Sequence, residues 1–296
     1  MTASLLTLLL SAAPIAAPPG DVPPGESKSR TTAYNPSAPS PAGHASVVGG
    51  ETGPVPPTAG VASVTGSFGY VYEPAFCMKK HLHGSPVPYE PRAGDIVLMV
   101  SDTVIWPILY AFALTSEPYH AAIIVQIPDG TFRLLEAGPP EMADHIRLLP
   151  IPERFEEQYG RIYIRRRAEP LTPEQSEALT GFALRQEGKP YAYVRFLGQA
   201  TPFRTRGPVR THHVGKSRGE PCSYFCTELV MEALVSAGLV DVETARPRAT
   251  VMKDLFYDES TNPYINQHLK LYPCWLPPQQ WVSDRCVVGT ASCSGK

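Results

Sequence analysis

The sequence predicts an α+β fold in which a small, mainly antiparallel sheet packs against helices. Four apolar segments of strand length predict the sheet, at residues 95–100, 121–127, 132–137 and 161–166. Two amphipathic segments predict helices, one beginning at Thr172 and the other near Cys226. No internal repeat with a period of about 20 to 50 residues is present, so a solenoid or propeller is excluded.

The four strand segments differ in pattern. Residues 95–100 (DIVLMV) and 121–127 (AAIIVQI) are almost continuously apolar, whereas residues 161–166 (RIYIRR) alternate like a half-exposed strand. Pro128, Asp129 and Gly130 supply a turn after the second segment, and Gly130 tolerates a positive φ. Residues 132–137 (FRLLEA) therefore form the returning strand of a hairpin.

Both helices have recognisable ends. In the first, Thr172 is the N-cap, Pro173 occupies the first helical position, and Gln175 completes a capping box. This helix has an apolar stripe and ends at Gly188. The second spans residues 226–237 (CTELVMEALVSA), with Gly238 in the position that follows a helix end.

The 296 residues divide by composition into three parts. Residues 1–17 contain an apolar run that ends in small residues, as in a secretory signal peptide. Residues 18–60 are rich in Pro, Gly, Ser and Ala, which predicts a disordered linker. Residues 61–296 are then the folded domain, and we expect the protein to be exported to the periplasm, the cell envelope or the extracellular space.

Charge and hydropathy exclude two classes of protein. With 26 Lys and Arg against 28 Asp and Glu, the net charge of −2 argues against binding nucleic acid through bulk charge. After the amino-terminal segment no apolar run reaches the roughly 18 residues that a transmembrane helix needs. The longest, residues 104–114 (VIWPILYAFAL), is expected in the core or in the wall of an apolar pocket.

Cys226 is the candidate nucleophile because it opens a helix. Free amides and the helix dipole favour an anion there, which increases the thiolate fraction of a cysteine. Such a thiol needs a base, and the base needs a group that orients it. His120 precedes one hairpin strand, and Glu136 lies in the other. If the loop is centred on Asp129, His120 and Glu136 share a face, whereas a one-residue change in register would separate them.

The order GDIVLM, HAAIIV, LLEA and YFCTELV resembles the permuted papain-like cysteine hydrolases of the NlpC-type superfamily, specifically the YiiX/YebB-like branch. The resemblance covers roughly residues 92–240 and implies a permuted papain-like fold. It implies that Cys226 is the nucleophile, His120 the general base and Glu136 the residue that orients the histidine. Glu228 matches the acidic position of the family's Cys-Ser-Glu pattern, in which this chain has Thr227 instead of serine.

The resemblance implies a thiol hydrolase that cleaves an amide or ester through a thioester, without a cofactor or metal. Relatives include amidases, peptidases and lipid acyltransferases, so the expected substrate is a small molecule, a peptide or a lipid acyl group. Glu228 and the nearby aromatics Tyr224 and Tyr191 are candidate substrate-binding residues. The alternative function is an inactive papain-like module that binds a lipid or an acidic ligand through residues 104–114 and the basic segment 204–218.

Each candidate also has a structural interpretation. Cys226 alone is compatible with a structural role, either as a buried cysteine or in a disulfide with Cys222. Tyr191 and Tyr224 are compatible with core positions. Glu141, Asp144 or a backbone carbonyl are alternatives to Glu136 for orienting the histidine. The segment that contains Cys77, His81 and His83 lacks a fourth ligand at zinc spacing and is expected to be a surface loop. Cys274, Cys286 and Cys293 suggest a disulfide-tied tail, and Trp275 and Trp281 are placed either over the cleft or in the core.

Overall fold

A computed structural model describes residues 68–72, 85–102, 105–113, 115–138, 143–260, 262 and 270–284. All of them fall in one compact unit, Ala62–Lys296. The elements are β1 (Tyr70–Tyr72), β2 (Pro86–Pro88), β3 (Ile96–Met99), α2 (Ile105–Phe112), β4 (His120–Gln126), β5 (Phe132–Ala137), β6 (Ile146–Pro150), α3 (Ile151–Glu156), β7 (Ile162–Arg165), α4 (Pro173–Gln186), α5 (Tyr193–Gly198), α6 (Pro208–His213), α7 (Cys226–Ser236), η1 (Pro247–Ala249), α8 (Met252–Tyr257) and β8 (Gln279–Val282).

The described strands form one sheet of eight in the order β2-β1-β8-β7-β3-β4-β5-β6, and every neighbouring pair is antiparallel. The predicted α+β class is therefore confirmed. The four predicted strands correspond to β3, β4, β5 and β7. The other four were not predicted because they are short segments without a clear two-residue alternation, such as PVP in β2 and QQWV in β8.

The β4–β5 hairpin has the register expected for a loop centred on Asp129. Ala122 pairs with Glu136, and Gly130 adopts a φ of 85° in the connecting turn. Because side chains alternate along a strand, His120 and Glu136 lie on the same face of the sheet. The predicted relationship between the two is thus confirmed at the level of the backbone.

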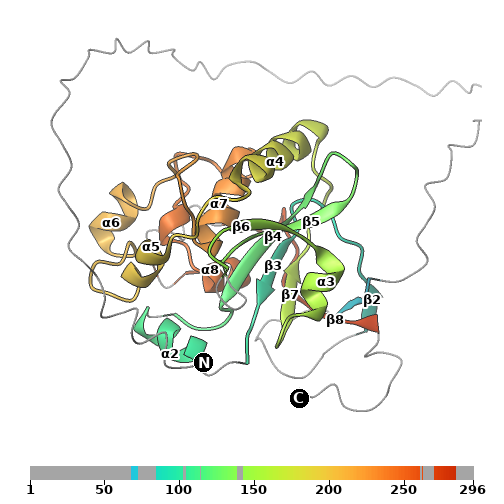
Figure 1. The fold of residues 1–296 in the computed structure, drawn as a ribbon, viewed down its shortest axis with the longest axis horizontal. Helices are drawn as coiled ribbons and strands as arrows, with labels where there is room; N and C mark the ends of the chain where they lie inside the picture. Colours follow the sequence, from blue (N-terminus) through green and yellow to red (C-terminus); the bar gives the residue numbers. More distant parts are fainter. Residues whose placement is uncertain are drawn as a thin grey trace, which may run out of the picture. The chain divides into compact units, whose positions relative to one another are not determined.

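The two faces of the sheet carry different cores. Ile123 of β4 packs with Leu179 of α4 and Leu229 of α7, whereas the next residue, Ile124, packs with Phe155 of α3. Figure 1 shows α4, α7 and α8 gathered along one side of the sheet and α3 on the other. The strand alternation therefore sends even-numbered β4 residues towards α3 and odd-numbered ones towards α7.

Both predicted helices are present with the predicted ends. Thr172 and Gln175 form the reciprocal capping box at the start of α4, at 3.3 and 3.0 Å. Gly238 follows α7 with a φ of 66°, which a side chain would oppose. The apolar segment after residue 104 is also helical, as α2, and contributes Tyr110 to the core.

The carboxyl-terminal tryptophans stabilise the core of the domain. Trp275 is 1% exposed, donates a hydrogen bond of 2.8 Å to the carbonyl of Gly94 and lies beneath the guanidinium of Arg167. Trp281 of β8 packs edge-on against Phe155. Of the two placements that the sequence left open, the structure therefore has the core placement. Among the described residues, no helix is both long and apolar enough to cross a bilayer.

Candidate active site

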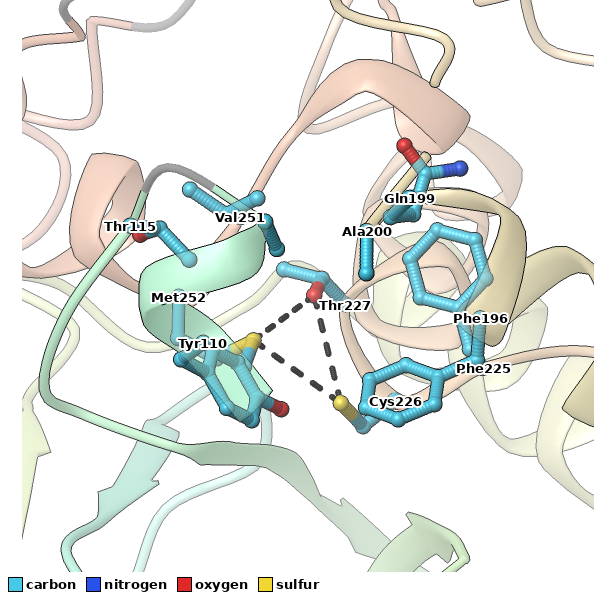
Figure 2. A pocket seen from close by; sticks show the side chains of 11 residues that line it. Tyr110, Thr115, Phe196, Gln199, Ala200, Phe225, Cys226, Thr227, Val251 and Met252 are labelled. Carbon is cyan, nitrogen blue, oxygen red and sulfur yellow. Dashed lines mark hydrogen bonds between the residues drawn. The ribbon is translucent and has the colours of Figure 1, made fainter. Parts of the chain in front are cut away.

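Cys226 is the first residue of α7, and its side chain is 2% exposed. The preceding residue, Phe225, has extended backbone angles, so the chain turns abruptly into the helix at the thiol. Sγ lies 3.8 Å from Sδ of Met252 and 3.9 Å from Oγ1 of Thr227 (Figure 2). Cys222 and Cys226 are both free thiols, so the alternative of a disulfide between them is not formed.

The side chains of His120 and Glu136 form an ion pair. Nε2 of His120 lies 3.2 Å from Oε1 of Glu136, with the imidazole 11% exposed and the carboxylate fully buried. The distance is that of an ion pair, although the geometry does not satisfy a directed hydrogen bond. The pair joins the start of β4 to the end of β5, as the register requires.

Glu136 also binds two arginines that sequence analysis missed. Nε of Arg154 donates a 2.8 Å hydrogen bond to Oε2, and Nη2 of Arg147 lies 3.5 Å from Oε1. Arg147 is the cross-strand partner of Glu136 on β6, so prediction of that strand would have revealed it. Arg154 comes from α3, a short helix that no sequence signal announced.

The pKa values in this cluster favour a charged pair. The pKa of His120 is raised to about 9: burial opposes the proton, but the Glu136 carboxylate and a hydrogen bond with the Cys226 thiol favour it. The pKa of Glu136 is lowered despite its burial, because His120 and Arg154 stabilise the carboxylate. The imidazole is therefore protonated at neutral pH.

The three residues approach one another around the end of a strand. His120 shares its strand face with Ile124, on the α3 side, whereas Cys226 belongs to the core on the α7 side. Because His120 is the first residue of β4, its ring lies at the sheet end, where it can contact both sides. This position is consistent with the ion pair to Glu136 and with the influence of the Cys226 thiol on the pKa of His120.

Tyr191 forms an isolated bridge with Tyr224, two residues before Cys226, and does not line the pocket described below. It is 6% exposed, and burial followed by the charge of Cys226 raises the pKa of its hydroxyl well above the ordinary value. Its ring packs edge-on against Tyr193 and fits against Gly138, where any Cβ would overlap the ring. Gly138 follows β5 with a φ of 81°, so the space for Tyr191 depends on a residue without a side chain.

The other two candidate substrate-binding residues lie in the interior. Tyr224 is fully buried, and its hydroxyl donates a 3.0 Å hydrogen bond to Gln186. Glu228 is also fully buried and accepts hydrogen bonds from Arg195 at 2.9 Å and Arg248 at 2.7 Å. Neither side chain lines the pocket beside Cys226.

That pocket spans about 420 Å³ when the open solvent at its mouth is included, and the space into which a water-sized group fits is about 30 Å³. Its lining residues come from α2, α5, the start of α7 and the start of α8, and they surround the thiol (Figure 2): Tyr110, Ala113, Thr115, Phe196, Gln199, Ala200, Phe225, Cys226, Thr227, Val251 and Met252. The expectation that the segment 104–114 lines an apolar pocket agrees with this arrangement. The contributions of α5 and α8 had no signal in the sequence, because residues so distant along the chain meet only in the fold.

The remaining candidates lie elsewhere. Asp144 is 82% exposed and binds its neighbour His145 at 2.6 Å rather than His120. In the segment 204–218, Arg206 forms an ion pair of 2.5 Å with Asp254 and is therefore not a free cation. The structure has no group of three or more His, Cys, Asp or Glu residues suited to a metal ion within its described part. Glu141 and the segment with Cys77, His81 and His83 lie outside the described residues, as do Cys286 and Cys293.

No protein-family model and no curated protein sequence matches this chain. Among solved structures, the chain is similar to the crystal structure of the metalloprotein yiiX from Escherichia coli O157:H7. The two share 17% sequence identity with a TM-score of 0.37, over 68% of this chain and 93% of that chain. A likeness of this degree assigns neither a family nor an activity, so the chemistry of the site follows from its own geometry.

Proposed function

We propose that the protein is a cysteine hydrolase that cleaves an amide or ester bond through a thioester on Cys226. The observation that carries the proposal is the cluster of a helix-opening thiol, a histidine whose pKa is raised to about 9 and a buried carboxylate 3.2 Å from that histidine. This combination supplies a nucleophile, an acid–base group and an orienting anion. The permuted papain-like order of the motifs supports the same assignment.

The proposed reaction has two halves. His120 holds the thiol proton, and the Sγ thiolate attacks the substrate carbonyl carbon to form a tetrahedral oxyanion. The oxyanion collapses to a thioester, the bond to the leaving nitrogen or oxygen breaks, and the imidazolium gives that atom its proton. Water then attacks the thioester, His120 accepts the water proton and returns it to the departing sulfur, and a carboxylic acid is released.

Two groups are suited to stabilise the oxyanion. The backbone amide of Cys226 is in the first turn of α7, where amides have no helical acceptor. The Tyr191 hydroxyl, which remains protonated because its pKa is far above neutrality, lies within the electrostatic reach of Cys226 and is the second donor. Removing one such donor lowers turnover by about 10²- to 10³-fold in other acyl-transfer enzymes.

Arg154 and Arg147 define the role of Glu136 in this proposal. A buried carboxylate whose only partner was His120 would compete with the imidazole for its proton. The two arginines stabilise the ionised carboxylate and so reduce this competition. Glu136 therefore holds the imidazolium in place without becoming the proton acceptor. Export of the protein also remains a proposal, and it rests on the pattern of residues 1–17 alone.

The second candidate function is a binding module without turnover. The apolar pocket favours it, because such a pocket holds a ligand whether or not Cys226 reacts. The two functions differ in the chemistry of the thiol. An enzyme needs a thiolate that depends on His120, whereas a binding module has no use for one.

The test is the pH dependence of iodoacetamide alkylation, resolved by mass spectrometry. Cys222 and Cys274 are exposed free thiols and serve as internal references in the same sample. We expect Cys226 to react at pH values where both references are protonated, and His120→Ala to abolish this difference. The exposed His213→Ala is the matched control and leaves it intact.

The complementary test is turnover of amide and ester substrates by Cys226→Ser and Cys226→Ala proteins that retain the wild-type circular dichroism spectrum. Loss of turnover in both supports the enzyme. Undiminished turnover in Cys226→Ala, or a Cys226 that reacts no faster than Cys222 at any pH, would reject it in favour of the binding module.

A further inference from the structure

We propose that the pocket beside Cys226 holds the acyl half of the substrate and selects an aliphatic acyl chain. The inference rests on the proposed function, because it assigns the substrate class of the same thiol. Cys226 is itself part of the pocket lining, so an acyl group attached to Sγ has direct access to the space between α2, α5 and α8 (Figure 2). Figure 2 shows the thiol between the rings of Tyr110 and Phe225, with Ala200 and Phe196 on the α5 side.

The lining contains no charged side chain. A carboxylate or ammonium buried there would have no counter-ion, which is strongly unfavourable in an apolar site. The buried acids Glu136 and Glu228 are paired with arginines, Glu136 with Arg154 and Glu228 with Arg195 and Arg248. Charged peptide groups are therefore excluded from the acyl side.

The polar side chains in the lining are largely occupied, which separates an aliphatic chain from a peptide. Tyr110 donates to the Tyr119 carbonyl, and Thr227 donates a 2.9 Å hydrogen bond to Sδ of Met252. Gln199 binds Thr205 through both atoms of its amide, at 3.1 and 3.2 Å. Among these lining side chains, the buried hydroxyl of Thr115 has no hydrogen-bond partner within the described part of the chain. A peptide acyl group brings an N–H and a C=O for each residue, and one hydroxyl cannot pair with all of them.

Two small residues from different helices line the pocket. Ala113 follows α2, and Ala200 follows α5. Each is only partly buried. A larger side chain at Ala200 would occupy the pocket without replacing a residue that contacts the thiol.

The first experiment measures kcat/KM for p-nitrophenyl esters of straight-chain acids from two to twelve carbons. Burial of each methylene stabilises the transition state enough to raise kcat/KM about fourfold, until the chain outgrows the pocket. We expect Ala200→Leu to flatten this chain-length profile. Ala168→Leu, at an exposed alanine outside the pocket, is the matched control and keeps the wild-type profile.

The esters also distinguish an aliphatic chain from an amino-acid residue. The p-nitrophenyl ester of N-acetyl-leucine presents an apolar side chain together with a peptide amide. A preference for this ester over the octanoate ester would overturn the proposal in favour of a peptide substrate. A profile that does not change with chain length, or one that Ala200→Leu leaves unaltered, would also overturn it.

The second experiment measures binding without turnover. It therefore tests the acyl-pocket inference separately from the proposed hydrolase activity. In the Cys226→Ala protein we expect the neutral fluorescent probe N-phenyl-1-naphthylamine to bind and to be displaced more effectively by dodecanol than by butanol. Ala200→Leu in the same background is expected to weaken probe binding at least tenfold, and Ala168→Leu to leave it unchanged. Displacement that is independent of chain length rejects the pocket inference, even if ester turnover supports the hydrolase.

Discussion

Arg154 donates a 2.8 Å hydrogen bond to Oε2 of Glu136, whereas His120 lies against Oε1, so the orienting acid of the candidate triad is itself held by a cation. Both side chains of this pair are almost completely excluded from solvent. Its position between α3 and β5 links the packing of a short helix to the proton affinity of the histidine. The candidate site therefore includes a guanidinium from α3 as well as the thiol at the start of α7.

Replacing Arg154 with Met should destabilise the fold, because it leaves Glu136 buried with less compensation for its charge. Loss of one partner of a buried ion pair costs about 3 to 5 kcal/mol. Arg147→Met is the control: its side chain is 27% exposed, and its contact with Glu136 is longer, at 3.5 Å, so the loss should be about 1 kcal/mol or less. Urea unfolding at pH 7 measures both. Equal losses in the two variants would show that Arg154 is not the main partner of Glu136.

Stability should fall with rising pH because of His120. Its pKa is about 9 in the folded protein and about 6.5 when unfolded, so the folded state holds the proton more tightly. This contribution is complete below pH 6.5 and declines as the pH rises through 9, by about 3 kcal/mol at most. The His120→Gln protein lacks this pH-dependent contribution to stability. Glu136 stays ionised across this window because its pKa is lowered, so it does not obscure the difference.

The measurement is the free energy of unfolding in urea at pH 6, 7.5 and 9.5, for wild type and His120→Gln. The advantage of the wild type should be largest at pH 6 and should shrink with each step. Groups other than His120 titrate in both proteins and cancel in the difference. Parallel curves would mean that His120 has the same proton affinity in the folded and unfolded chain.

Gly138 should be necessary for the position of Tyr191. Gly138→Ala and Gly130→Ala both force an alanine into a positive φ, of 81° and 85°, which costs about 1 to 2 kcal/mol. Only at Gly138 does the added methyl group overlap the Tyr191 ring, because the surroundings of Gly130 are open. We therefore expect a larger loss of stability for Gly138→Ala than for Gly130→Ala, and a loss of turnover of at least tenfold for Gly138→Ala alone. Equal turnover in the two variants would show that the position of Tyr191 does not affect the reaction.

The elements that the sequence predicted are those whose signals are local. The capping box at Thr172 and the Gly130 turn each depend on a few neighbouring residues, and both are present. Strands β1, β2, β6 and β8 are stabilised by their neighbours in the sheet rather than by their own pattern, so they were missed. The helices α5 and α6 lie in a stretch where proline and glycine interrupt every apolar repeat.

The candidate site was likewise predictable only where its contacts follow from local sequence signals. The relation of His120 to Glu136 followed from hairpin register, which a turn of known length determines. Arg154 and Met252 were not foreseen, because their contacts join segments about 18 and 26 residues away from Glu136 and Cys226 through tertiary packing. Tyr224 and Glu228 were placed near the substrate by their proximity in sequence to Cys226. The helical twist turns Glu228 away from the pocket, towards two arginines.

Glu228 should therefore support the site rather than bind substrate. Its carboxylate accepts from Arg195 of α5 and Arg248 of η1, and so ties both elements to the first turn of α7. Glu228→Gln leaves the largely buried Arg248 and the partly exposed Arg195 without their counter-charge, and we expect a loss of about 3 kcal/mol in urea unfolding. At a temperature where the variant is still folded, kcat should fall because Cys226 is less well positioned, whereas KM should stay within about twofold of wild type. A rise in KM with undiminished stability would instead place Glu228 in contact with the substrate.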